Sequence, residues 1–228
     1  MSIKAIITGS TGMVGEGVLH ECLQHPEVES VLVINRKPCG VNHSKLKEII
    51  HVDFSEFSTI ESELSGYNAA FLCMGVSSMG LKEATYTKFT YDMTMALAKP
   101  LERLNPDMIV CYVSGQGTDT SETGRMMWAR VKGKTENDLM KMAFKRAYLF
   151  RPAAIQPTPG LKNSYAFYKI LNPLIPFLRK LFPQYFTTLK EIGLAMIQVV
   201  KDGYSQQVIE VKDIVSLASQ HLSEGENR

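Results

Sequence analysis

The start of the chain constrains its fold more than any other stretch. An unbroken apolar run, IKAIIT at residues 3–8, is followed by Gly9, Gly12 and Gly15 and then by an amphipathic segment, MVGEGVLHECLQH. Glycine at the first position permits a tight turn, at the second it lets a ligand approach the backbone, and at the third it lets helix and strand pack closely. The order strand, glycine loop and helix therefore predicts the first unit of a parallel α/β fold.

The rest of the chain alternates in the same way. Apolar runs typical of strands buried on both faces stand at residues 30–35, 48–53, 69–75, 108–114 and from 147. Helical patterns stand at about 83–104 and 127–144, from Thr188 and from Asp213. This predicts an α/β fold with a doubly wound parallel sheet, the Rossmann fold, in a single domain of residues 1–228. Residues 157–187, rich in proline and aromatic side chains, are predicted to form a small C-terminal substrate lid.

Composition and charge exclude several classes of protein. The net charge of +2 argues against a nucleic-acid-binding protein, which normally carries a concentrated basic face. The five histidines show no metal-ligand spacing, so no metal site is expected. The longest apolar stretch, residues 168–186, is interrupted by charges and prolines, so no membrane span is expected.

The cysteines carry information about the compartment. Cys22, Cys39, Cys73 and Cys111 are scattered, without a CxxC pair. This is typical of reduced thiols and offers no disulfide framework. Because the chain also enters a strand at once, without an apolar leader, we expect a cytoplasmic protein.

The start of the first helix is expected to hold phosphates, since free backbone N–H groups and the helix dipole favour anions there. No Gly-Lys-Ser/Thr ends the loop, which disfavours a P-loop nucleoside triphosphatase. The glycine spacing instead predicts a dinucleotide site. The residues expected to contact the dinucleotide are Gly9, Ser10, Thr11, Gly12, Met13, Val14, Gly15, Arg36, Lys37, Asp53, Phe54, Cys73, Met74 and Gly75.

The end of the second strand favours NADP over NAD. A site for NAD usually carries an acidic residue there to bind the adenosine ribose, whereas this chain has Asn35, Arg36 and Lys37. Arg36 can bind a 2′-phosphate with its forked guanidinium, although two basic residues at the start of a surface loop are also common by chance. Asp53 could accept a hydrogen bond from the adenine amino group, cap the helix-like segment that follows it, or do both.

With these motifs the chain resembles an atypical short-chain dehydrogenase/reductase, of the Tat-interacting-protein-like and NmrA-like kind and related to the NAD-dependent epimerases/dehydratases. The resemblance covers about residues 3–155 and rests on TGSTGMVG, HVDF, FLCMG, YVSGQG, VKGKTENDL and LFRPAAI, in that order. It implies a nicotinamide cofactor and a small-molecule substrate. The family's catalytic serine corresponds to Ser114 and its lysine, which also holds the cofactor's ribose, to Lys132. The family's tyrosine, four residues before the lysine, corresponds to Trp128.

Trp128 leaves two functions open. An indole N–H can donate a hydrogen bond but cannot act as a proton acid near neutral pH, and loss of a positioned general acid costs about 10²–10⁴-fold in rate. The chain is either an oxidoreductase on a small carbonyl or apolar substrate, with Tyr165, Tyr168 or a lysine-linked water as the acid, or a weak or inactive NADP(H)-dependent binding or regulatory module. A protein partner suits the second function, and the chain is expected to be a monomer or a homodimer.

The three matched side chains also have structural explanations. Ser114 could close a turn with Gly115 and Gly117, Lys132 could be a solvated helix residue, and Trp128 could fill space under the lid.

The segment after the last strand of the resemblance is expected to build the substrate pocket. Small side chains at Pro152, Ala153 and Ala154 would leave room beside the nicotinamide. The aromatic side chains of the lid would either line an apolar pocket or form the lid's own core: Tyr165, Phe167, Tyr168, Phe177, Phe182, Tyr185 and Phe186.

Overall fold

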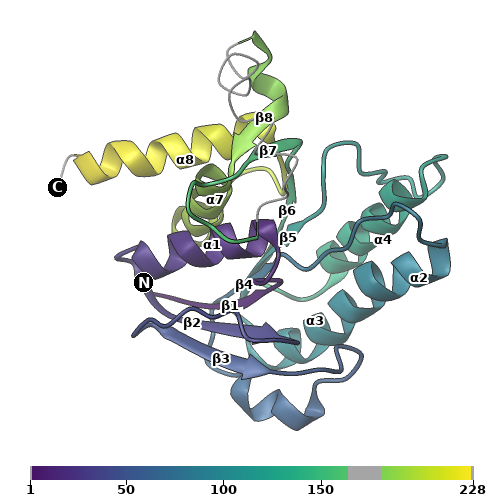
Figure 1. The fold of residues 1–228 in the computed structure, drawn as a ribbon, viewed down its shortest axis with the longest axis horizontal. Helices are drawn as coiled ribbons and strands as arrows, with labels where there is room; N and C mark the ends of the chain where they lie inside the picture. Colours follow the sequence, from purple (N-terminus) through teal and green to yellow (C-terminus); the bar gives the residue numbers. More distant parts are fainter. Residues whose placement is uncertain (1, 164–180, 227–228) are drawn as a thin grey trace.

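A seven-stranded sheet forms the centre of the molecule in the computed structural model, which describes residues 2–163 and 181–226 (Figure 1). Neighbouring strands are parallel, in the order β3-β2-β1-β4-β5-β6-β9. The strands are β1 (Ile3–Thr8), β2 (Val28–Asn35), β3 (Leu46–Ile50), β4 (Ala69–Leu72), β5 (Ile109–Val113), β6 (Arg146–Arg151) and β9 (Val208–Glu210). The predicted doubly wound Rossmann fold is confirmed.

The order of the strands reverses between β1 and β4. The chain lays down β1, β2 and β3 outward in one direction, and β4 then pairs with the other edge of β1, from Ala5↔Ala69 to Thr8↔Leu72. In sheets of this kind, ligands bind in the crevice outside the carboxyl ends of the strands at the reversal. The loops that follow β1 and β4 are brought together at this point of the sheet edge.

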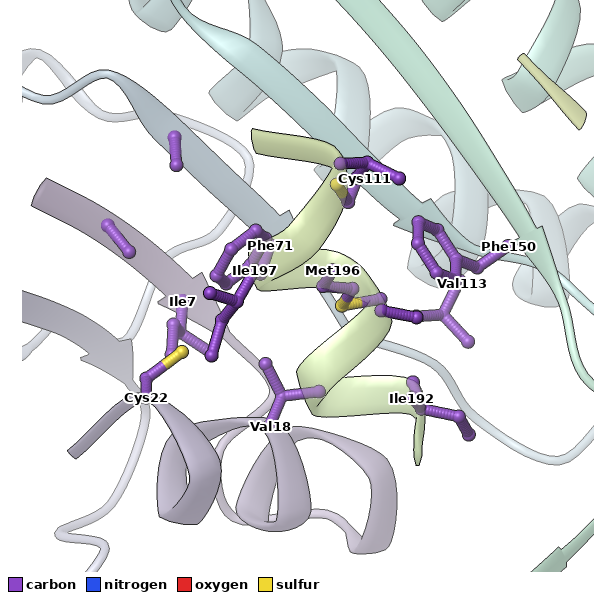
Figure 2. Close-up of a cluster of buried hydrophobic side chains, with 14 of the residues drawn as sticks. Ile7, Val18, Cys22, Phe71, Cys111, Val113, Phe150, Ile192, Met196 and Ile197 are labelled. Atoms are coloured by element: carbon purple, nitrogen blue, oxygen red, sulfur yellow. The ribbon is translucent and has the colours of Figure 1, made fainter. Parts of the chain in front are cut away.

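Three helices cover one face of the sheet, namely α1 (Met13–Gln24), α7 (Leu189–Asp202) and α8 (Val211–Glu226) (Figure 1). Figure 2 shows side chains of α1 and α7 gathered against those of the strands, among them Val18, Met196, Phe71 and Phe150, all fully buried. Burial of apolar surface stabilises a fold by about 25 cal/mol per Å². This layer therefore fixes α1, and with it the glycine loop, on the sheet.

The opposite face is covered by α2 (Glu83–Thr87), α3 (Met93–Leu104) and α4 (Met127–Lys141), with η1 (Ser58–Glu63) at its edge. The helix predicted over 83–104 is observed, but a π turn, η2 (Lys88–Asp92), separates α2 from α3. The helix predicted to reach 144 ends at Lys141. The helix-like segment after Asp53 contains only the short 3₁₀ helix η1.

Two strands end earlier than the sequence predicts. The strand predicted over 48–53 ends at Ile50, so that Asp53 lies in the following loop, and the strand predicted over 69–75 ends at Leu72. At this point the chain passes close to the glycine loop, since a Cβ on Gly9 would lie 2.6 Å from the carbonyl oxygen of Cys73. The chain leaves the sheet where it crosses the glycine loop, and the apolar character of Cys73 and Met74 reflects packing there.

A second, two-stranded parallel sheet was not predicted. Its strands, β7 (Ala154–Gln156) and β8 (Phe186–Thr188), bracket the predicted lid, and η3 (Pro183–Tyr185) precedes β8. The carboxylate of Glu16 in α1 accepts hydrogen bonds from the backbone N–H groups of Lys162 (2.8 Å) and Asn163 (2.7 Å). These bonds fix the start of the segment to the first helix. Residues 164–180 lie outside the described residues, so the lid stays a prediction.

The last two helices begin close to where the sequence places them. Thr188 caps α7 through a capping box, in which its hydroxyl accepts the N–H of Glu191 and the Glu191 carboxylate accepts the N–H of Thr188. The final helix, α8, begins at Val211, two residues before the predicted Asp213. Within the described parts of the chain, no helix is both long and apolar enough to cross a membrane.

Candidate active site

A cleft runs along the carboxyl ends of the strands where their order reverses. It consists of two cavities, of about 230 Å³ and about 460 Å³, which share the lining residues Gly12, Cys73, Met74 and Gly75. We call the smaller cavity, at the end of β2, the β2 compartment, and the larger one, at the ends of β5 and β6, the β5 compartment. The glycine loop stands between them.

A larger hollow, of about 700 Å³, lies elsewhere, between η1 and α3. Its lining includes Glu61, Lys99 and Arg103, which are surface charges away from the carboxyl ends of the strands. Size alone therefore does not locate the site, whereas the strand reversal does.

The glycine loop is held in shape by its own backbone. Gly9 has a φ of +75°, in the left-handed region that favours glycine, and its carbonyl oxygen accepts the N–H of Gly12 at 2.9 Å. A Cβ on Gly15 would lie 2.1 Å from that same carbonyl oxygen. The first turn of α1 thus closes tightly onto the end of β1, which is the geometry expected from the sequence.

The N-terminus of α1 opens into the cleft. Its N-cap is Gly12, with no side-chain capping bond, and the N–H groups of the first helical residues have no acceptor within a helix. Met13 and Val14, at these positions, line the β5 compartment. The uncapped donors and the positive end of the helix dipole favour anionic groups at this point.

Ser10 lies beneath the loop rather than in the cleft. It is 2 % exposed, and its hydroxyl donates to Oδ1 of the buried Asn35 at 2.9 Å. Ser10 therefore ties the glycine loop to the end of β2. Its neighbour Thr11 is exposed and lines the β2 compartment.

The outer end of the β2 compartment carries the predicted basic residue. Arg36 is exposed and lines this compartment together with Phe54. Lys37 is exposed as well but is not among the lining residues. Of the two basic residues, Arg36 is therefore the one placed to meet a ligand.

Asp53 takes part in a turn. Its Oδ1 accepts the backbone N–H of Ser55 at 2.9 Å and the Ser55 hydroxyl at 2.5 Å. These hydrogen bonds lower the pKa of Asp53. Asp53 therefore closes a turn with Ser55 and does not cap η1, whose N-cap is Phe57. A contact of Asp53 with a cofactor stays a prediction.

A carboxylate that sequence reasoning missed approaches the end of β2 from β3. Glu48 accepts hydrogen bonds from Nδ2 of Asn35 at 2.7 Å and from the backbone N–H of Cys39 at 2.9 Å. Only the register of β2 on β3, in which Val33 pairs with Glu48, brings this residue to Asn35. Glu48 does not line the β2 compartment.

The β5 compartment brings together Ser114, directly after β5, and Lys132 of α4. Nζ of Lys132 donates to the carbonyl oxygens of Ser114, at 2.5 Å, and Val113, at 3.3 Å. Burial lowers the pKa of Lys132 to about 8, and the negative charge of Glu136 acts in the opposite direction. Lys132 is therefore mostly a cation at pH 7 and loses its proton as the pH rises through about 8.

Trp128 lies in the first turn of α4, beside the cleft. A Cβ on Gly117 would lie 3.6 Å from Cη2 of Trp128, and one on Gly115 would lie 4.0 Å from Cζ3. Gly117 has a φ of +86°, which lets the loop after Ser114 turn under the indole. Trp128 thus packs on this loop and is not among the residues that line the β5 compartment.

A buried charge network behind Ser114 was missed by sequence reasoning. Glu136, one helical turn after Lys132, is 0 % exposed and accepts the hydroxyl of Ser114 at 2.5 Å. Arg151, at the end of β6, donates Nε to Oε1 of Glu136 at 3.0 Å and Nη2 to Oε2. Nη2 of Arg151 also donates to the hydroxyl of Thr120 at 2.9 Å. The available signal was the spacing of four residues between Lys132 and Glu136, which places both on one helix face.

The rest of the lining agrees in part with the sequence. Pro152 and Ala153 line the β5 compartment as expected, whereas Ala154 does not. Gln116 also lines it, and sequence reasoning did not single this residue out because a glutamine in a loop carries no distinctive spacing. Its amide can both donate and accept hydrogen bonds.

The tyrosines lie apart from the β5 compartment or outside the described residues. Tyr86 and Tyr112 are 2 % and 0 % exposed and pack in the interior. Phe182 and Tyr185 of the predicted lid are each 48 % exposed, so these two rings are not packed in a core. Phe186 lies in β8 and is half-buried. The other aromatic residues of the predicted lid lie outside the described residues: Tyr165, Phe167, Tyr168 and Phe177.

Residues 5–136 match the family model described as the NAD dependent epimerase/dehydratase family. The match covers more than half of the chain. It runs from β1 to α4 and includes the glycine loop, Ser114 and Lys132.

Among curated proteins, the chain is similar to fungal proteins named FMP52, mitochondrial. It is 26% identical over 167 residues to the protein of Debaryomyces hansenii, covering 71% of this chain and 72% of that protein. It is 26% identical over 172 residues to the protein of Candida albicans, covering 72% and 74%. The protein of Emericella nidulans is 26% identical over 156 residues, covering 65% of each.

The expectation of a cytoplasmic protein is contradicted by this comparison, because these relatives are named as mitochondrial. That expectation rested largely on unpaired thiols, and Cys22 and Cys111 are indeed free and buried. Free thiols indicate a compartment that keeps cysteines reduced. They do not say which compartment it is, so the inference went further than its physical basis.

Among solved structures, the chain is similar to a UDP-N-acetylglucosamine 4-epimerase from Methanobrevibacter ruminantium M1, with a TM-score of 0.66, 14% identity and coverage of 98% of this chain and 83% of that one. It is also similar to the Bordetella bronchiseptica enzyme WbmF in complex with NAD+, with a TM-score of 0.65, 14% identity and coverage of 100% and 79%. A short chain dehydrogenase family protein from Francisella tularensis gives a TM-score of 0.62 at 16% identity, covering 89% and 93%. At these identities the likeness shows the fold alone.

Proposed function

The chain belongs to the NAD dependent epimerase/dehydratase family, and from that premise we propose that it is an NADP-dependent oxidoreductase that acts on a small carbonyl compound or the corresponding alcohol. The resemblance to atypical short-chain dehydrogenases/reductases, inferred from the motifs, is confirmed by the family match and by the fold of the solved neighbours. One observation carries the proposal. Ser114 and Lys132 converge on the compartment that adjoins the glycine loop.

The shape and the donors of the cleft fit a dinucleotide. The uncapped start of α1 would hold the pyrophosphate between the two compartments. The β2 compartment would take the adenosine half, with Arg36 at its outer end for a 2′-phosphate. Glu48, the nearby carboxylate, is engaged by Asn35 and Cys39, which supports NADP over NAD.

The β5 compartment would take the nicotinamide half and the substrate. When bound, the nicotinamide cofactor supplies or accepts a hydride. The ammonium of Lys132, held by two backbone carbonyl oxygens, would bind the nicotinamide ribose. Ser114 would orient the substrate oxygen, while Pro152 and Ala153 leave room for a small substrate.

Trp128 supports a second candidate function, an NADP(H)-dependent binding or regulatory module with little turnover. At the position that the family gives to tyrosine, an indole provides no proton acid. Its ring packs on the loop after Ser114 instead of entering the cleft. A missing general acid slows the reaction by about 10²–10⁴-fold but leaves substrate positioning intact. Slow turnover would therefore identify the chain as an oxidoreductase. Cofactor binding with no turnover would identify it as a binding or regulatory module.

The test uses the single tryptophan of the chain. Because Trp128 lies beside the β5 compartment, we expect NADPH to quench its emission through energy transfer. We then expect slow NADPH consumption with a panel of aldehydes, ketones and quinones, and loss of that consumption in Lys132→Met. Binding without turnover on any of these compounds would favour the module. Absence of binding of both NADPH and NADH at millimolar concentration would refute the proposal.

The names of the fungal relatives bear on where the protein works. We propose a mitochondrial location, supported by those names alone. A fluorescent protein fused to the C-terminus should colocalise with a mitochondrial marker in the native organism. A diffuse signal throughout the cytosol would contradict this proposal.

A further inference from the structure

The hydroxyl of Ser114 has one hydrogen to donate and two lone pairs to accept with. The structure places two acceptors around that hydroxyl, Oε1 of Glu136 at 2.5 Å and the backbone oxygen of Phe150 at 3.2 Å. Both belong to the protein interior, and neither a carboxylate nor a carbonyl oxygen can donate a hydrogen in return. The hydrogen of Ser114 therefore points away from the β5 compartment with either acceptor.

Glu136 is held in the position that imposes this orientation. Its carboxylate is fully buried and receives hydrogen bonds from Nε and Nη2 of Arg151. Arg151 is itself fixed by the hydroxyl of Thr120, at 2.9 Å, and by the carboxylate of Glu210, at 3.6 Å. The bond to Glu136 raises the pKa of Arg151, so the guanidinium keeps its charge and its partner. A rotation of Glu136 would break a buried ion pair, which is strongly unfavourable.

We propose that Glu136 fixes Ser114 as a hydrogen-bond acceptor toward the cleft, so that the site binds its substrate as the alcohol, whose hydroxyl donates to Oγ of Ser114. Glu136 is thus a positioning residue that acts through Ser114. This inference rests on the proposed oxidoreductase function and names the substrate class of the same site. The lone pairs of Ser114 that face the cleft accept a hydrogen bond from a substrate hydroxyl. They offer no donor to a substrate carbonyl.

A carbonyl compound is at a disadvantage here for a physical reason. Its oxygen can only accept, so it would face the lone pairs of Ser114 unless Ser114 gave up its bond to Glu136. A hydrogen bond to a charged group corresponds to about 10- to 100-fold in an equilibrium constant. The alcohol of a matched pair should bind more tightly than its carbonyl partner by about this factor.

The test measures binding, so it does not depend on turnover. The probes are cyclohexanol with cyclohexanone and benzyl alcohol with benzaldehyde, titrated against the full chain by the emission of Trp128, with and without NADP. We expect the wild type to prefer each alcohol by about 10- to 100-fold. Ser114→Ala should abolish the preference, because it removes the acceptor.

Glu136→Gln tests the positioning role. The amide of glutamine can donate to Oγ of Ser114, which frees the Ser114 hydrogen to face the cleft. The preference for the alcohol should then fall to about 1 or turn toward the carbonyl. Ser121→Ala is the matched control, because the Ser121 hydroxyl is exposed and bound to Asp119 at 2.6 Å, in the same loop but outside the cleft. This control should keep the full preference.

Several outcomes would overturn the inference. These are equal or tighter binding of the carbonyl probes by the wild type, failure of both alcohols to bind, and an unchanged preference in Glu136→Gln or Ser114→Ala. Thermal unfolding and energy transfer from Trp128 to NADPH establish that each variant is folded. Should Glu136→Gln not fold, Glu136→Asp keeps the charge beside Arg151 but withdraws it from Ser114, and it should lower the preference. Loss of NADPH binding by the wild type would instead count against the proposed function, because the preference is also measured without cofactor.

Discussion

The glycine loop and the surroundings of Ser114 differ in the atoms that form them. At the glycine loop, which stands between the two compartments, the recognition groups are backbone atoms of one continuous stretch, held by the turn at Gly9 and the close packing at Gly15. Around Ser114, at the β5 compartment, the recognition groups are side chains from separate elements. Lys132 comes from α4, and Arg151, at the end of β6, acts through the buried carboxylate of Glu136.

This difference explains how a family fold can keep its cofactor site while its chemistry changes. Backbone donors tolerate most substitutions, because the glycines alone must stay free of side chains. A side-chain site is altered by one replacement, and the proposed match of Trp128 to the family's tyrosine would be such a replacement. Variants should therefore affect the two regions separately, and the following predictions run from the largest expected effect to the smallest.

Replacing the indole should change the chemistry without changing cofactor binding. Trp128→Tyr places a phenol on the α4 face that carries Lys132, and we expect kcat for NADPH-dependent carbonyl reduction to rise by about 10²–10⁴-fold. The dissociation constant of NADPH, from its own fluorescence, should stay the same. Trp128→Phe is the control, since it makes the same space without the hydroxyl. An equal gain in Trp128→Phe would show that space and not the acid had been limiting.

Adding one carbon to the loop should damage the cofactor side. Gly15→Ala would put a Cβ 2.1 Å from the backbone oxygen of Gly9, where no side-chain rotation can relieve the clash. We expect NADPH affinity to fall by about 100-fold and the free energy of unfolding to drop by about 3 kcal/mol. Gly12→Ala is the graded comparison, since its Cβ would lie 3.3 Å from the same oxygen. Titration calorimetry and urea unfolding measure both effects, and an equal loss of unfolding free energy in the two variants would contradict the steric account.

Removing the exposed guanidinium should separate the two cofactors. Arg36→Ala is expected to lower the affinity for NADP by about tenfold and to leave the affinity for NAD almost unchanged, because the lost interaction is with the 2′-phosphate. Lys37→Ala, the neighbouring cation outside the lining, should leave both affinities nearly unchanged. Equal weakening of NADP and NAD by Arg36→Ala would remove the argument for NADP.

The smallest effect is on pH dependence and belongs to the β5 compartment. The pKa of Lys132 is about 8, so the protonated form, which carries the charge and the extra donor, is lost as pH rises through that value. NADPH affinity should be full at pH 7 and fall by about three- to fivefold above pH 9. Lys132→Met should bind NADPH more weakly, and its affinity should show no inflection near pH 8. Lys37→Met should keep the inflection. An inflection that survives in Lys132→Met would assign the titration to another group.

Elements that are marked by a pattern of neighbouring residues could be predicted from the sequence, whereas features that depend on long-range contacts could not. The strands and the long helices appear where hydrophobic periodicity over several residues predicts them. β4 ends at Leu72, short of residue 75, where the chain passes Gly9, and no local pattern contains this long-range contact. The pairing of β7 with β8 was missed for the same reason, because three-residue strands carry too little periodicity and their partners lie about thirty residues apart.

The site divides along the same line. The turn at Gly9 and the uncapped start of α1 follow from neighbours in the chain, and the motifs also placed Ser114 and Lys132 in one compartment. The motifs gave Trp128 a position on α4, but only the folded loop shows that its ring lies on Gly117 beside the cleft.

The amino-acid sequence by itself determined a parallel α/β sheet with a glycine loop at its centre, because apolar period and glycine spacing act over a few consecutive residues. The tertiary structure alone decided that Glu136 meets Ser114, 22 positions away, and Arg151, 15 positions away. A buried carboxylate must find partners within hydrogen-bond distance, and which residues those are depends on how α4 lies over the ends of β5 and β6. The positions of these residues along the chain do not give the distances between their side chains in the folded protein.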